Sequence, residues 1–376
     1  MNRYKERMLD GLMRIAPPGA PVRRWHVSPL IDSLAYHWSW LLALIPMLMM
    51  GSEREDYLVL FLLVLTLNFA HRHLTLPIVY CDRQVLRTNP LRFTIAPIAM
   101  VALFAIEPVL WKSDHRFAFV VIATFSGAWG LWHTIQQKYG ILRLYVVKSE
   151  VAADKRTPPW VDRMLVHGWF PVWIVYLGTS HRDLVEQGFS RAEFFINPIM
   201  DALVGIRVWA LPLAGALAAF SVAAFLWYEW RNDRFSNRAR LFMGIGTAAL
   251  SVSFLLLDPA KVFLSYTFSH ALEYFVFVWA YQRKRFADPT SGPSLMKRML
   301  RQPALCYWGF LLGISAVYLG VRYWGVYFFP EEDTIRLAGI SGSRWIYYWG
   351  ISQSMVHFYY DGFMWKMRSP VTRANL

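Results

Sequence analysis

Seven side chains of metal-ligand type lie inside apolar stretches of this chain, on four separate segments that also carry two glutamines. They are His71 and His73; His133, followed by Gln136 and Gln137; His270 with Glu273; and His357 with Asp361. An ionisable side chain inside a bilayer costs about 3 kcal/mol on insertion scales, so its presence there is a functional hypothesis by default. Imidazole and carboxylate ligands suit Fe, Zn, Cu and Mn. Because seven candidate ligands suit two metal ions better than one, the set predicts a polynuclear site, and we expect two irons.

The spacing on two of the segments places a histidine and a carboxylate on the same helix face. His270 and Glu273 are three residues apart, and His357 and Asp361 are four apart. Helical bundles with dinuclear carboxylate sites also use a carboxylate and a histidine three apart, in the order Glu-x-x-His, which is reversed here. Asp361 could bind a metal directly or orient a histidine.

The remaining candidate ligands lie on the segments around His71 and His133. His71 and His73 are two residues apart, so a regular helix would point them to opposite sides. Pro77 removes a helical hydrogen bond and crowds the carbonyl four residues earlier, which is that of His73. We therefore expect a distorted turn that lets both histidines ligate. Near His133, we expect Gln136 and Gln137 to face the substrate or to orient ligands, because amide oxygens bind metals weakly.

The composition predicts an integral membrane protein. Of 376 residues, 56% are hydrophobic and only 17% are charged, whereas soluble chains carry about 25% charge. The apolar residues form blocks long enough to span about 30 Å of hydrocarbon. We predict one all-α membrane domain over residues 1–376, a bundle of about ten transmembrane helices near 31–50, 57–80, 91–111, 116–137, 163–180, 207–229, 238–257, 259–281, 303–329 and 344–366.

The distribution of basic residues predicts the orientation of these spans. Of the 39 Lys and Arg residues, 28 lie in the two termini and alternate loops, and 9 lie in the opposite loops. This bias places both termini in the cytoplasm, including the basic segment 1–30, of a multi-pass protein of the bacterial inner membrane. The net charge of +14 is thus a topology signal that also attracts membrane lipids, and we expect no nucleic-acid partner. With this topology, His71, His133, His270 and His357 all lie between mid-membrane and the cytoplasmic boundary.

The histidine inventory and its depth resemble the membrane-bound, histidine-rich diiron oxygenases and desaturases. The resemblance covers only the four ligand segments, and the usual histidine boxes of that class are absent. It implies iron, O2 and a lipid-like hydrophobic substrate. We expect a separate electron donor at the cytoplasmic face, with Lys138 and Arg143 as docking charges, because no flavin or nicotinamide motif is visible.

Other classes of protein remain open on the sequence alone. An intramembrane zinc-dependent lipid hydrolase would use a few histidines and aspartates at a similar depth, and an ion- or proton-coupled transporter would use buried His and Glu as relays. Haem between two histidines is a further alternative. Thiolate iron–sulfur ligation is excluded, because Cys81 and Cys306 are the only cysteines. His37 and His167, which begin two spans, could complete a metal site.

Overall fold

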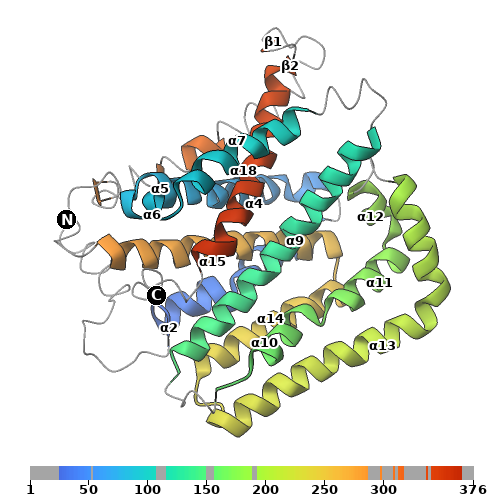
Figure 1. Cartoon of the computed structure of the whole chain (residues 1–376). Helices are drawn as coiled ribbons and strands as arrows, with labels where there is room; N and C mark the ends of the chain where they lie inside the picture. The colour runs from blue at the N-terminus through green and yellow to red at the C-terminus, as the bar shows by residue number, and fades with distance from the viewer. Residues whose placement is uncertain are drawn as a thin grey trace. The chain divides into compact units, whose positions relative to one another are not determined.

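The chain forms an α-helical protein, in agreement with the predicted fold class (Figure 1). The only strands in the described part of the chain are Arg336–Leu337 and Ile340–Ser341, which pair antiparallel. The computed structural model describes residues 25–51, 54–106, 116–149, 156–188, 193–286, 297–298, 308–309, 312–316, 336–337 and 340–365. Most of the predicted span 303–329 and of the basic segment 1–30 lies outside these residues.

The helices group into two compact units. The first unit comprises Met1–Tyr57 and Leu131–Glu273, and the second comprises Leu58–Gly130 and Tyr274–Leu376. Two long helices, α9 (Arg116–Val147) and α15 (Pro259–Phe286), continue from one unit into the other. Since one domain can contain two such units, the prediction of a single domain stays a prediction.

The first unit begins with α2 (Pro29–Asp32), a π-helical turn η1 (Ser33–His37) and α3 (Ser39–Leu48), so the predicted span 31–50 is interrupted at Trp38. A 3₁₀ turn at Arg54–Tyr57 ends this part of the chain. After α9, the unit continues with α10 (Pro159–His167), α11 (Phe170–Ser180), α12 (Arg182–Gly188), α13 (Glu193–Asp233) and α14 (Arg238–Leu256).

The second unit contains the remaining described helices. They are α4 (Leu58–His73), α5 (Thr75–Tyr80), α6 (Arg83–Thr88), α7 (Pro90–Ala105) and α18 (Gly342–Met364), together with the adjoining parts of α9 and α15. Helix α18, drawn in red in Figure 1, packs against α4 and α7. One hydrophobic cluster of this unit is formed by Phe104, Tyr348, Met355 and Phe358.

Three stretches of the described residues are helical, long and apolar enough to cross a membrane: Glu55–Tyr80, Ile196–Asn232 and Arg238–Leu256. The first and third coincide with predicted spans. The second is much longer than the predicted span 207–229, because the apolar sequence before residue 207 continues the helix through Pro198.

Two further predicted spans, 57–80 and 163–180, are each divided into two helices. Between α4 and α5, the Leu74 amide donates to the His71 carbonyl at 3.2 Å, a tightened i→i−3 turn. This break lies three residues before Pro77 and confirms the distortion expected there. Between α10 and α11, a Cβ on Gly168 would lie 2.6 Å from the Met164 carbonyl oxygen, so only glycine fits.

A buried ionic network holds four helices of the first unit together. Arg240 of α14 is 2% exposed and donates to Glu229 of α13 at 2.7 Å, to Asp162 of α10 at 2.6 Å and to the Leu142 carbonyl of α9 at 3.1 Å. Arg143 donates to Asp162 as well, at 2.9 Å. Arg240 and Arg143 are among the 28 basic residues used to predict the topology, but their carboxylate partners give them a structural role, because a buried charge is stable only when paired.

Candidate metal sites

The second unit brings His71 and His357 together. His71 lies in the last turn of α4 and His357 in α18; both are at most 1% exposed. Their rings are nearly perpendicular, with centroids 5.0 Å apart. Each offers a ring nitrogen within 4.8 Å of one from the other. Two buried imidazoles at this separation could hold a metal ion.

Asp361 adds a carboxylate to this pair, one helical turn after His357. Its Oδ2 lies 3.8 Å from His357 Nε2, and two atoms bound to one ion at about 2.1 Å each are separated by at most about 4.2 Å. The other oxygen, Oδ1, accepts hydrogen bonds from the Tyr274 hydroxyl at 2.8 Å and from Trp365 Nε1 at 2.9 Å. The carboxylate is therefore oriented by two donors on its far side, as metal-binding carboxylates usually are.

The His357 ring is also held in place from α5. Its Nδ1 lies 2.8 Å from Thr75 Oγ1. If Nδ1 carries the proton and donates to that hydroxyl, Nε2 is left to bind a metal, which is the usual arrangement for a ligating histidine. Thr75 is the first residue after the break at Leu74, so the break positions this oxygen. The Tyr274 ring meets the His357 ring edge-on, with centroids 4.9 Å apart.

His73 has different neighbours from His71. Its ring contacts Phe69 at 4.4 Å and Trp349 at 6.3 Å between centroids. Its Nδ1 hydrogen-bonds with the Phe69 carbonyl at 2.9 Å. The distorted turn is present, but these contacts do not bring His73 beside His357. Ligation by His73 stays a prediction.

The first unit contains a second histidine pair. His133 of α9 and His270 of α15 are buried, with ring centroids 5.3 Å apart and planes at 87°. Gln137, one turn after His133, donates to the His270 carbonyl at 2.9 Å and to Glu273 Oε2 at 3.0 Å. Gln136 instead lies 3.3 Å, nitrogen to nitrogen, from the ring of His167. Only Gln137 is thus tied to the predicted ligand residues.

The Glu273 carboxylate already accepts hydrogen bonds from side chains of the first unit. Its Oε1 accepts from the Lys138 ammonium and from Ser269 Oγ, the latter at 2.7 Å. Ser269 Oγ in turn lies 2.7 Å from Ser39 Oγ of α3. With Gln137 on Oε2, both oxygens of this fully buried carboxylate are hydrogen-bonded. Glu273 could reach a metal only through the remaining lone pair of Oε2.

The expectation that Lys138 is a docking charge is wrong. Lys138 is 2% exposed, and its ammonium pairs with Glu273 and donates to Ser269 at 3.1 Å. Arg143 is partly exposed, but it donates to the Thr157 carbonyl and to Asp162. Both residues lie just after a predicted span, where charges are usually solvated. Here α9 continues to Val147, so they pack inside the unit instead.

The two further histidines considered as ligands, His37 and His167, lie among aromatic rings. His37 is 1% exposed at the end of the π-helical turn, among the rings of Trp25, Tyr145 and Phe242. Within the described part of the chain, neither of its ring nitrogens has a hydrogen-bond partner. His167 contacts Trp132, with centroids 4.7 Å apart.

Several residues that shape these groups were missed by sequence reasoning. They are Thr75, Ser269, Tyr274 and Trp365. Tyr274 could have been found, because it follows Glu273 directly and lies four residues after His270, on the same helix face. The others depend on tertiary contacts.

Comparison with known proteins finds no match: no family model, no curated protein and no solved structure is similar to this chain. The function must therefore be argued from the residues themselves. Each unit has a buried histidine pair that could hold a metal ion, and in the second unit an oriented carboxylate lies beside one member of the pair, His357. The prediction that all four segments share one dinuclear centre stays a prediction.

Proposed function

We propose that this chain is a membrane-embedded, metal-dependent oxidoreductase that uses O2 to oxidise a lipid-like hydrophobic substrate. The observation that carries the proposal is that His357 lies beside both His71 and Asp361 in a buried part of the second unit. Two histidines and one carboxylate are the donor set of many non-haem iron oxygenases. Iron held by such ligands activates O2.

The residues around these ligands have distinct roles in the proposal. His71 and His357 would hold the metal through imidazole nitrogen, and the Asp361 carboxylate would offset part of its charge. Thr75 orients the His357 ring, while Tyr274 holds the far oxygen of Asp361. Burial of both histidines keeps water away from the reacting atoms.

A second iron is proposed at the histidine pair of the first unit, His133 and His270. The sequence predicts two ions, and this pair is supported by its ring separation and burial. Glu273 would join it through Oε2, since Oε1 already accepts from Lys138 and Ser269. In this arrangement Gln137 bridges the carboxylate and the backbone of His270 and acts as a positioning residue.

We propose further that the chain crosses the bacterial inner membrane about ten times, with both termini in the cytoplasm. The support is the charge bias of 28 to 9 and the three helical stretches that are long enough to span. A separate electron donor would then act at the basic cytoplasmic face. A fluorescent protein fused to the C-terminus should glow, and alkaline phosphatase fused there should be inactive; the reverse would reject this topology.

Two specific observations favour other classes. Catalytic zinc sites use three protein ligands and one water, so the His71, His357 and Asp361 group also fits an intramembrane zinc hydrolase. The buried Lys138–Glu273 pair would suit an ion- or proton-coupled transporter, in which such charges act as relays.

Oxygen uptake separates these classes. The protein would be purified without oxygen, reconstituted with lipid extract, loaded with Fe(II) or Zn(II), and given a chemical reductant. We expect oxygen uptake and an oxidised lipid product with iron only, and neither in the His357→Ala variant. A product that forms equally well without O2 and with zinc as the only metal would replace the oxidase with the hydrolase.

A further inference from the structure

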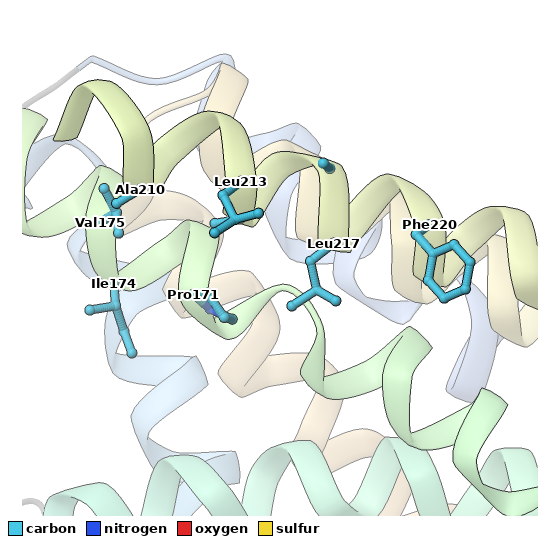
Figure 2. A pocket seen from close by; sticks show the side chains of 9 residues that line it. Pro171, Ile174, Val175, Ala210, Leu213, Leu217 and Phe220 are labelled. Carbon is cyan, nitrogen blue, oxygen red and sulfur yellow. The ribbon is translucent and has the colours of Figure 1, made fainter. Parts of the chain in front are cut away.

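An apolar groove runs between α11 and α13 of the first unit (Figure 2). Its volume is about 820 Å³, within the range of roughly 300–1,000 Å³ typical of small-molecule sites. Figure 2 shows Leu213, Leu217 and Phe220 of α13 along one side, and Pro171 and Ile174 of α11 along the other. Val175, Ala210, Ala214 and Ala216 complete a lining without any polar side chain.

The groove lies along a helix that is long and apolar enough to cross a membrane. All of its α13 residues fall within the stretch Ile196–Asn232. Leu213 is 74% exposed, Phe220 55% and Ile174 54%. Apolar side chains that are this exposed on a membrane-crossing helix contact hydrocarbon. The chemistry of the lining therefore matches an acyl chain.

One end of the groove carries a positive charge. Arg207 lies three residues before Ala210, so it continues the α13 stripe of Ala210, Leu213 and Leu217. Arg207 Nη2 donates to Ser180 Oγ, at the end of α11, at 3.0 Å. It forms no ion pair within the described part of the chain.

The neighbouring cation, Arg182, differs from Arg207 in forming ion pairs. Arg182, two residues after Ser180, forms ion pairs with Glu186 and Asp201, each with a nitrogen–oxygen distance of 2.7 Å. Those hydrogen bonds raise the pKa of the Arg182 guanidinium above its ordinary value, Glu186 contributing most. Arg182 is thus paired with two carboxylates, whereas the one hydrogen bond of the Arg207 side chain among the described residues is to a hydroxyl.

We propose that this groove binds an anionic phospholipid, with one acyl chain between α11 and α13 and its phosphate on Arg207 and Ser180. From Arg207 to Phe220 the helix rises about 20 Å, which is more than the roughly 15 Å depth of one leaflet's hydrocarbon. Arginine is suited to phosphate, because its guanidinium presents several donors in one plane. The proposal needs only the membrane location and is independent of the metal chemistry.

The test measures phospholipid retained by the full chain. Protein in a mild detergent is mixed with phosphatidylglycerol or phosphatidylcholine, and native mass spectrometry counts the lipids that remain bound. We expect one phosphatidylglycerol per chain, retained more strongly than phosphatidylcholine. Arg207→Gln should weaken retention about fivefold, the factor expected for one basic residue at a lipid headgroup. Ala216→Phe should fill the groove and abolish the retention of phosphatidylglycerol.

Matched variants on the same helix serve as controls. Arg231→Gln removes an exposed charge beyond the groove, and Ala219→Phe adds the same bulk at an exposed position outside the lining. Both should retain lipid like the unsubstituted protein. The proposal would be overturned if Arg207→Gln and Ala216→Phe retained phosphatidylglycerol as strongly as the unsubstituted protein does. It would also be overturned if native mass spectrometry showed a dimer of the chain that Ala216→Phe abolishes, because the groove would then hold a second copy of the chain.

Discussion

Replacing Lys138 by Met tests the buried ion pair at the centre of the first unit. The Lys138 ammonium pairs with Glu273, and the two residues are 2% and 0% exposed. Met keeps most of the side-chain volume but removes the charge. Breaking a buried pair costs about 3–5 kcal/mol, because the remaining charge has no partner. Ser269 and Gln137 still donate to Glu273, so we expect the lower end, about 3 kcal/mol.

The assay is reversible unfolding of the purified protein in mixed detergent micelles, followed by tryptophan fluorescence. A loss of 3 kcal/mol corresponds to a fall in Tm of roughly 6–12 °C for a unit of about this size. The double variant Lys138→Met with Glu273→Gln should recover at least half of the loss, since removing both charges of a buried pair is often nearly neutral. Arg231→Met, at an exposed position, is the control.

Two outcomes would refute this reasoning. If Lys138→Met changed the free energy of unfolding by less than about 0.5 kcal/mol, the value typical of surface substitutions, Lys138 would not be buried with Glu273. If the double variant were destabilised by the sum of the two single changes, the two side chains would not interact.

Two further predictions concern single contacts. Tyr274→Phe removes the hydroxyl that orients Asp361 and should weaken metal binding about 10- to 100-fold with little change in stability, as measured by metal titration; unchanged affinity would mean that Asp361 is not a ligand. Arg240→Met leaves two buried carboxylates without their shared cation and should cost about 3–5 kcal/mol, whereas Arg238→Met, exposed on the same helix, should cost less than about 0.5 kcal/mol by the same unfolding assay.

Local rules predicted the parts of the fold that local sequence controls. Pro77 interrupts the helix close to His73, where its missing amide and its ring act on the preceding turn. His357 and Asp361 lie on one face of α18, as a spacing of four requires. The apolar blocks also correctly predicted that the fold is α-helical, apart from one short strand pair in the described residues.

Tertiary partners were beyond the reach of these rules. Lys138 and Glu273 are 135 residues apart in the chain, and nothing local to either position specifies the other. Arg240 was read as a topology charge, because the positive-inside rule counts charges without asking whether they are buried. The length of α13 was missed because hydropathy locates a span but does not tell where a helix ends.

The central claim is that His71, His357 and Asp361 hold iron, and metal analysis of the purified protein tests it most directly. Protein isolated without oxygen would be analysed for iron and zinc, alongside the His357→Ala and Asp361→Asn variants, with membrane insertion checked for each. His181→Ala is the control, because this histidine of the first unit hydrogen-bonds with Tyr176 and is not a proposed ligand. The proposal predicts two irons per chain in the unsubstituted protein and in the His181 variant, and loss of one in the other two. Full iron content in His357→Ala, or zinc as the only metal, would contradict it.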